Sequence, residues 1–213
     1  MSTSDHDLTR ALDALVAACR HLATQGLSPG GSGNVSLRVG TRLLVTPTGS
    51  SLSRLTPEAV TVLEDGEVRS GGRPSKELPL HRAFLAARPE LTAVVHLHSP
   101  YAVAASCLDA TAPPPATGPL PALTPYQVMR LGALPVAPYA PPGSAELAQG
   151  VAALAGEHTV VLLANHGSVV AGPTLDAATD LAEELEAAAR LHFVLADRPH
   201  RLLTPEQVDA LRR

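Results

Sequence analysis

The stretch TAVVHLHSPYAVAASC, residues 92–107, predicts a buried strand that leads directly into a helix. Its first seven residues are rich in β-branched side chains, which favour strands. A helical pattern follows at once, over residues 100–108. A strand joined directly to a helix is typical of an α/β protein.

Further strands and helices are predicted on both sides of this stretch. Two pairs of short strands read as hairpins, because Gly40-Thr41 and Asp65-Gly66 separate their members. Residues 110–125 are rich in proline and predict a surface loop. The predicted strands cover 34–39, 42–46, 60–64, 67–70, 92–98, 134–139 and 159–165, followed by a hairpin partner that begins at Gly167. The predicted helices cover 8–25, 78–88, 100–108, 144–156 and 174–196, with short ones starting at Thr56 and Thr204.

The order of these elements predicts the fold class. Strands and helices alternate without a strict βαβ rhythm, and several neighbouring strands form hairpins. We therefore expect a single-domain α/β/α sandwich over residues 1–213, with a central mixed, mainly antiparallel sheet.

Composition excludes several classes of function. The 213 residues carry a net charge of -4 with no basic tract, so a nucleic-acid partner is not expected. No stretch of about 18 residues is apolar throughout, so no membrane span is expected. Cys19 and Cys107 form no disulfide framework, and the N-terminal segment is polar and acidic rather than a signal sequence. A cytoplasmic protein is expected.

His96-Leu97-His98 is a candidate metal-binding pair. Alternate residues of a strand project to one face, so two imidazoles roughly 6–7 Å apart can bind one zinc-like ion. His166 supplies a candidate third ligand, from the end of another predicted strand. Three histidines with a fourth position open is the arrangement of catalytic sites. Histidines that are simply hydrogen-bonded in the core or at the surface would give the same pattern.

Pro74-Ser75-Lys76-Glu77 is a candidate anion-binding segment. It presents a hydroxyl, a cation and a carboxylate in succession, and Lys76 is the only lysine in the chain. It can equally be read as a helix start, capped by Ser75 and favoured by Glu77, and such a start is itself an anion site. Two glycine-containing loops, 30–34 and 46–49, offer backbone N–H groups to an anion or simply turn the chain.

Taken in order, the segments GSGNVS, TPTG, PSKE, HLH and NHG resemble the class II aldolase/adducin family, over nearly the whole chain. The resemblance implies a divalent metal, usually zinc, held by three histidines. It implies an acid/base role for Glu77, and a cyclic homotetramer with active sites at subunit junctions. The matching metal ligands are His96, His98 and His166. The matching phosphate pocket consists of Asn34, Thr48, Gly49, Ser75 and the position of Lys76.

Longer segments are similar to a branch of this family that acts on 3-oxo-tetronate 4-phosphates. These segments are PSKELPLH, VVHLHSPYAVAASCL, LTPYQVMRLGALPVAPYAPPG and VLLANHGSVVAG. Lys76 replaces a serine of the aldolase pattern, and the chain ends without the aldolase's C-terminal tyrosine. The resemblance implies a lyase that decarboxylates its substrate to dihydroxyacetone phosphate and carbon dioxide through a metal-stabilised enediolate. Glu77 is the first candidate proton donor and Tyr126, which can also be read as a packed aromatic residue, is the second.

Two other functions remain open from the sequence. A sugar-phosphate aldolase of the L-fuculose-phosphate type, or an L-ribulose-5-phosphate 4-epimerase, would use the same metal ligands. A non-catalytic binding domain, as in adducin, would have the fold without the chemistry. That last alternative predicts lost ligands, whereas the three histidines and Glu77 are present here. The sequence favours the decarboxylase.

Overall fold

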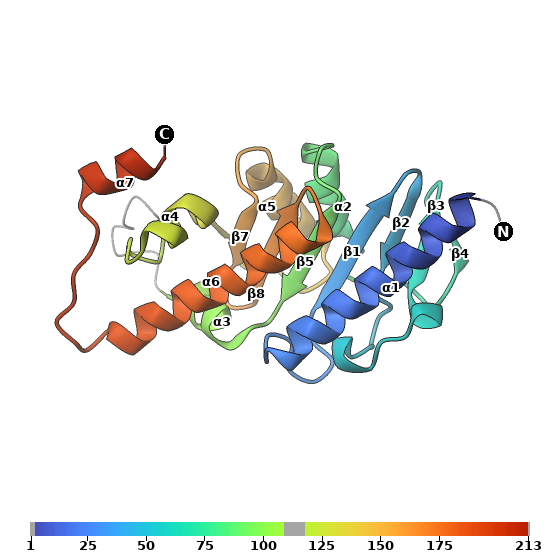
Figure 1. Ribbon diagram of the computed structural model, residues 1–213, viewed down its shortest axis with the longest axis horizontal. Coiled ribbons are helices and arrows are strands. Elements are labelled where there is room, and N and C mark those ends of the chain that lie inside the picture. The colour runs from blue at the N-terminus through green and yellow to red at the C-terminus, as the bar shows by residue number, and fades with distance from the viewer. Residues whose placement is uncertain (1–2, 109–117, 213) are drawn as a thin grey trace.

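The computed structural model describes residues 3–108 and 118–212, and its centre is one eight-stranded sheet (Figure 1). The strand order is β4-β3-β2-β1-β5-β8-β7-β6, and only the β6–β7 pair is parallel. The predicted mixed, mainly antiparallel sheet is therefore confirmed. The strands are β1 (Asn34–Val39), β2 (Arg42–Val45), β3 (Thr61–Glu64), β4 (Glu67–Ser70), β5 (Ala93–Leu97), β6 (Val136–Ala137), β7 (Val160–Leu163) and β8 (Gly167–Gly172).

Helices cover both faces of the sheet, as the α/β/α prediction requires. Helices α1 (Thr3–Thr24) and α6 (Leu175–Leu195) lie side by side across one face, with α3 (Pro100–Ser106) packed against α6 (Figure 1). Helices α2 (Leu78–Ala87) and α5 (Ala145–Ala155) pack together on the other face. The remaining helices are α4 (Pro125–Leu131), α7 (Pro205–Leu211), which packs on α4, and two 3-10 turns at Leu52–Arg54 and Pro57–Ala59.

Two apolar cores fill the spaces between the sheet and its helix layers. Because successive strand residues point to opposite faces, β5 contributes to both cores. Val95 and Leu97 pack in the core on the α1 and α6 side, whereas Val94 packs with Phe84 in the core on the α2 and α5 side. His96 follows the alternation of Val94, so its side chain projects toward the α2 side of the sheet.

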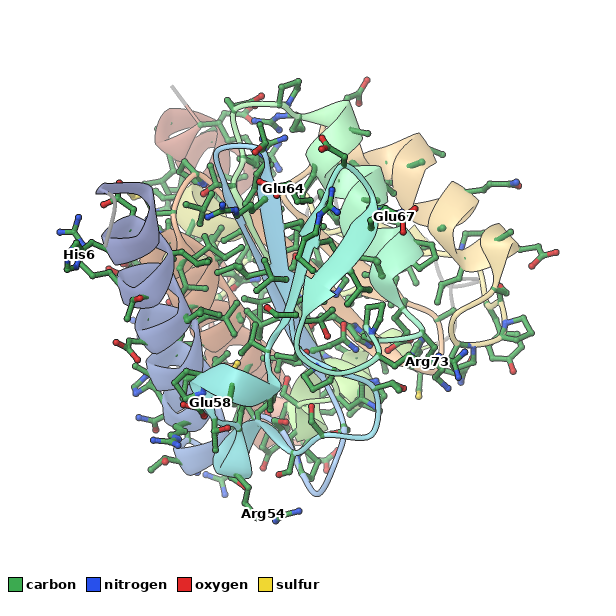
Figure 2. The ribbon with its side chains drawn as sticks, turned by 90° about the vertical axis from the view of Figure 1, so that its right-hand side faces the viewer. His6, Arg54, Glu58, Glu64, Glu67 and Arg73 are labelled. Carbon is green, nitrogen blue, oxygen red and sulfur yellow. The ribbon has the colours of Figure 1, made fainter. Side chains whose placement is uncertain are left out.

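Most short-range predictions agree with the structure, but helix α4 was not predicted, and its first residue lies in the predicted loop. All three predicted hairpins form, and LPVAPY contains the edge strand β6. The opposite edge strand, β4, is exposed throughout and bears charged residues such as Glu67, which oppose edge-to-edge association (Figure 2). Of the predicted loop 110–125, residues 110–117 lie outside the described residues, 118–124 form neither helix nor strand, and Pro125 begins α4.

Side-chain hydroxyls cap several helices where the sequence places them. Thr174 accepts a hydrogen bond from the N–H of Ala177 at the start of α6, and Thr204 forms a capping box with Gln207 at α7. Within residues 3–108 and 118–212, none of the helices combines the length and apolarity needed to cross a bilayer.

Candidate active site

Strand pairing places His96 at the centre of the candidate site. In the sheet His96 lies directly opposite Asn34 of β1 and opposite Val169 of β8. Its side chain is fully buried, and Nδ1 lies 2.8 Å from the Ser168 carbonyl oxygen. Because a carbonyl only accepts, Nδ1–H donates, and Nε2 faces the interior of the site.

His98 lies one residue beyond the strand. We predicted it within the strand, but β5 ends at Leu97 because pairing with β8 stops there. The imidazole still turns to the same place, with Nε2 3.0 Å from Nε2 of His96. The expected convergence of the two rings is therefore present, although His98 is held by the start of the loop rather than by the sheet.

His166 reaches the other two histidines through a tight turn between β7 and β8. Asn165 has a φ of 56° and Gly167 a φ of 149°, both in the region that L side chains rarely adopt. A Cβ at position 167 would lie 2.3 Å from the carbonyl oxygen of Leu97, so only glycine lets this turn approach β5. The close approach places the ring centroids of His98 and His166 4.7 Å apart.

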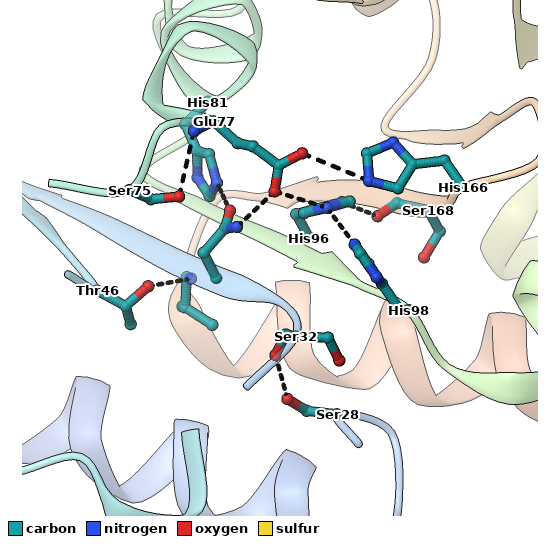
Figure 3. Close-up of polar contacts among 12 residues, drawn as sticks. Ser28, Ser32, Thr46, Ser75, Glu77, His81, His96, His98, His166 and Ser168 are labelled. Carbon is teal, nitrogen blue, oxygen red and sulfur yellow. Dashed lines mark hydrogen bonds and ion pairs between the residues drawn. The ribbon is translucent and has the colours of Figure 1, made fainter. Parts of the chain in front are cut away.

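Glu77 points into the space between these rings (Figure 3). Its Oε2 lies 3.2 Å from His96 Nε2, and its Oε1 lies 3.4 Å from His166 Nε2. The Asn34 amide donates to Oε2 at 2.9 Å. We expected Ser75 to cap α2, but the helix begins at Leu78, and Ser75 Oγ accepts instead from the N–H of Glu77 at 3.2 Å. Glu77 stands at the helix start without a side-chain cap bond, because its carboxylate is turned toward the histidines.

Burial and neighbouring charges shift the pKa values of these groups toward the protonation states that bind a metal. Burial, together with the neighbouring imidazoles of His96 and His166, lowers the pKa of His98 to about 4. Burial and His96 likewise lower the pKa of His166. For Glu77, burial by itself raises the pKa, but the hydrogen bond and charge of His96 and the amide of Asn34 outweigh it and hold the pKa below its ordinary value. Neutral imidazoles at His98 and His166, beside an ionised Glu77, are the protonation states that a divalent cation requires.

The geometry of the four groups fits a divalent ion. One ligand atom from each of Glu77, His96, His98 and His166 lies within 4.8 Å of all the others. Ligands about 2.0–2.1 Å from a tetrahedral ion lie about 3.3–3.4 Å from each other, close to the separations given above. Both ring nitrogens of His166 and Oε1 of Glu77 are buried without a hydrogen-bond partner within the described part of the chain. A cation bound between Glu77 and the histidines would give a partner to those of these atoms that point into the cluster.

An anion-sized cavity adjoins the histidine cluster. Its volume is about 180 Å³, and it is lined by residues 31–34, 47–50 and 75–77 and by His98. The predicted phosphate positions Asn34, Thr48, Gly49, Ser75 and Lys76 therefore share one cavity. A larger hollow of about 580 Å³, between α6 and the residues after α1, contains none of the predicted site residues.

Lys76 is held at the rim of this cavity by the loop before α5. Gly143 has a φ of 83°, and a Cβ there would lie 3.1 Å from the Lys76 carbonyl oxygen and 3.3 Å from its Cγ. The absence of a side chain at Gly143 thus leaves room for the stem of Lys76. The exposed ammonium adds positive charge near the histidines, since it contributes to the lowered pKa of both His98 and His166.

Tyr126 is not brought to the cluster within its own chain. It lies on α4 with 56% of its surface exposed, and it does not line the cavity. The guanidinium of Arg130 lies 5.8 Å from its ring centroid. A catalytic role for Tyr126 stays a prediction.

The sequence prediction missed two buried polar residues, one beside the site and one on the opposite face of the sheet. His81 hydrogen-bonds Asn34, and Glu186 of α6 accepts from the N–H groups of Tyr101 and Ala102 at the start of α3. Both lie on the buried faces of their helices. A polar residue on such a face is the signal that could have found them, since burial without a partner is costly.

Comparison with known proteins identifies the family to which the chain and its fold belong. Residues 13–193 match the class II aldolase and adducin N-terminal domain. The crystal structure of YgbL from Klebsiella pneumoniae, for which aldolase, epimerase and decarboxylase activities are all named, superposes with a TM-score of 0.89. It is 42% identical and covers 96% of this chain and 99% of its own. The chain therefore belongs to the class II aldolase and adducin family, whose aldolases use a divalent metal.

Two relatives indicate which branch of that family this chain resembles. The 3-oxo-tetronate 4-phosphate decarboxylase of Escherichia coli K12 is 45% identical over 190 residues, which cover 88% of each chain. The Haemophilus influenzae protein of the same name is 44% identical over 201 residues, covering 93% of this chain and 94% of its own. An L-fuculose phosphate aldolase of E. coli is more distant, at 33% identity over 182 residues, covering 84% of this chain and 80% of its own.

Proposed function

We propose that this chain is a metal-dependent lyase that decarboxylates a 3-oxo-tetronate 4-phosphate to dihydroxyacetone phosphate and carbon dioxide. The observation that carries the proposal is the convergence of Glu77, His96, His98 and His166 beside an anion-sized cavity. The identity of 44–46% to four decarboxylases of that name supports the choice of reaction. The intact ligand set argues against a non-catalytic binding domain.

The chemistry divides between the ion and the side chains of this chain. A divalent ion held by the histidines would supply Lewis-acid stabilisation of the charge that develops on the ketone oxygen as carbon dioxide leaves. Glu77 is ionised at neutral pH, because its pKa is held low, and must gain a proton before it can give one. We assign it to take the proton of the hydroxyl beside the ketone and to deliver it to the carbon that lost the carboxyl group. A proton from water then restores the hydroxyl, so that one proton is consumed for each carbon dioxide released.

The cavity is assigned to the phosphate group. Loops 31–34 and 47–50 offer the N–H groups of their glycines and the hydroxyl of Thr48, and the start of α2 adds the positive end of a helix dipole. Thr48, Gly49, Ser75 and Lys76 are the proposed phosphate contacts. The side chain of Asn34 is already engaged with Glu77 and His81, so its share in phosphate binding is limited to the remaining amide N–H.

Three finer assignments belong to the same proposal. Zinc is the proposed ion, because imidazole nitrogen is one of its preferred ligands. A homotetramer with sites at subunit junctions is the proposed assembly. In such an assembly the exposed Tyr126 could reach the active site of a neighbouring subunit. A cytoplasmic location is proposed from Cys19 and Cys107, both free thiols.

A direct assay tests the proposed reaction. The purified, metal-loaded protein is supplied with a 3-oxo-tetronate 4-phosphate or with L-fuculose 1-phosphate. We expect the first compound alone to yield dihydroxyacetone phosphate, with one carbon dioxide released per molecule. Dihydroxyacetone phosphate from the second compound, together with an aldehyde, would instead assign the aldolase activity.

Lys76→Ser tests the phosphate assignment. A phosphate contact is made equally in the ground and transition states, so we expect KM to rise by about 10–100-fold, corresponding to about 1.5–3 kcal/mol, with kcat little changed. Inhibition by inorganic phosphate should weaken in parallel.

Arg73→Ser is the matched control for Lys76→Ser. It removes a nearby exposed cation that does not line the cavity, and both kinetic constants should stay close to those of the parent (Figure 2). An unchanged KM and unchanged phosphate inhibition in Lys76→Ser would refute the phosphate contact. A fall in kcat would place Lys76 at the departing carboxylate.

A further inference from the structure

A chain of buried hydrogen bonds runs from β1 through α2 to Glu77. Ser36 Oγ lies 2.8 Å from His81 Nδ1, and His81 Nε2 lies 2.5 Å from Asn34 Oδ1. The amide of the same Asn34 donates to Glu77 Oε2 at 2.9 Å. Ser36 and His81 are both fully buried, and Asn34 and Glu77 are nearly so.

The direction of each bond in this chain follows from chemistry. An amide oxygen only accepts, so His81 Nε2–H is the donor to Asn34. Burial, followed by the charge of His96, lowers the pKa of His81 to about 3, so the ring is neutral and Nδ1 accepts from the Ser36 hydroxyl. The carboxylate of Glu77 only accepts, so the amide N–H of Asn34 must face it.

Secondary-structure geometry brings these four residues together. Asn34 and Ser36 are two residues apart on β1, so their side chains leave the same face of the sheet. Glu77 and His81 are four residues apart at the start of α2, so they share one face of that helix. Hydrogen bonds join the strand pair to the helix pair. His81 bonds to both Asn34 and Ser36, and Asn34 also bonds to Glu77.

We propose that His81 is a positioning residue that fixes the amide of Asn34 with its N–H toward Glu77, and so orients the carboxylate for proton transfer. Without the donor on Nε2, the Asn34 oxygen loses its partner and the amide is free to rotate. A rotated amide would present its oxygen to the Glu77 carboxylate, and two acceptors repel one another. This proposal rests on the acid/base role assigned to Glu77 above.

A double-mutant cycle between His81 and Asn34 tests this indirect action. His81→Phe keeps a ring of similar size and removes both hydrogen bonds, and we expect kcat to fall by about 10–100-fold with KM nearly unchanged. Because His81 acts through Asn34, the same substitution in an Asn34→Ala background should change kcat by no more than about twofold. Additive losses in the cycle would overturn the proposal.

A conservative variant and a core variant separate positioning from mere packing. The side-chain amide of His81→Gln can place an N–H close to where Nε2 stands, and we expect it to restore kcat to within about fivefold of the parent. Phe84→Leu, in the core on the same helix, should lower the melting temperature while kcat is preserved. If kcat simply follows melting temperature across these variants, His81 has only a structural role.

A measurement on the unmodified protein needs neither activity nor metal. In the ¹⁵N-histidine-labelled, metal-free chain, NMR should show His81 as the Nε2-protonated tautomer, and Ser36→Ala should shift mainly its Nδ1 resonance. An Nδ1-protonated ring would reverse the bonds and refute the proposal even where His81→Phe fails to fold. If the parent decarboxylates nothing, the proposed function fails, whereas this readout still decides the direction of the hydrogen bonds.

Discussion

Replacing His98 with alanine is expected to remove the bound ion and to reduce turnover to that of the chelated parent. The substitution deletes one of the three imidazoles that meet at the site, and with it the Lewis acid on which the proposed decarboxylation depends. His98 suits this test better than His96, because it is half-buried and lies outside the strand, whereas His96 is fully buried and bonded to the Ser168 carbonyl. We expect the variant to fold.

The measurements are metal content by elemental analysis, circular dichroism and initial rates, each compared with the parent before and after chelation. His6→Ala is the matched control, since His6 is an exposed histidine of α1 that points away from the molecule (Figure 2). It should keep both the ion and the activity. If the parent protein stays fully active after exhaustive chelation, the reaction does not depend on a metal.

The hairpins of the fold could be predicted because their signals are local. Gly40-Thr41 and Asp65-Gly66 each separate two short strands, and Gly40, Asp65 and Gly66 adopt the positive φ that such turns require. The order of strands in the sheet could not be predicted this way. The pairing of β1 with β5, and of β5 with β8, joins segments far apart in the sequence. No periodicity within one segment specifies which distant segment it meets.

The candidate site shows the same division between local and distant signals. His96 and His98 were recognisable because a strand places alternate residues on one face, and Glu77 because it lies in a short polar segment at a helix start. The contact between Glu77 and His166 was expected only from the family resemblance, since it depends on how α2 and the β7–β8 turn pack. His81 was missed because a single histidine in the apolar pattern LPLHRAFL carries no spacing signal. Its partners, Asn34 and Ser36, come from strand β1, which is distant in the sequence.

Glu77→Gln should lower kcat by roughly 10²–10⁴-fold, the usual contribution of a positioned acid/base group, or about 3–5 kcal/mol of barrier. The substitution is nearly isosteric. A glutamine oxygen can still accept from the Asn34 amide, and its NH₂ can face the imidazoles, so the local hydrogen bonds and the fold should survive. What is lost is a group able to take a proton from the substrate hydroxyl and return it to carbon.

Metal content decides whether the loss reflects proton transfer or ligation. Glu77 lies close enough to His96 and His166 to share an ion with them, so rates are measured at saturating metal and the affinity for the metal is measured separately. An acid/base role predicts that kcat falls while metal content is unchanged. Glu77→Asp, which keeps the carboxylate on a shorter stem, should recover part of the rate. A Glu77→Gln enzyme whose kcat is within about threefold of the parent's would show that Glu77 only has a structural role at the helix start. A proton-transfer group cannot be replaced by an amide at so small a loss of rate.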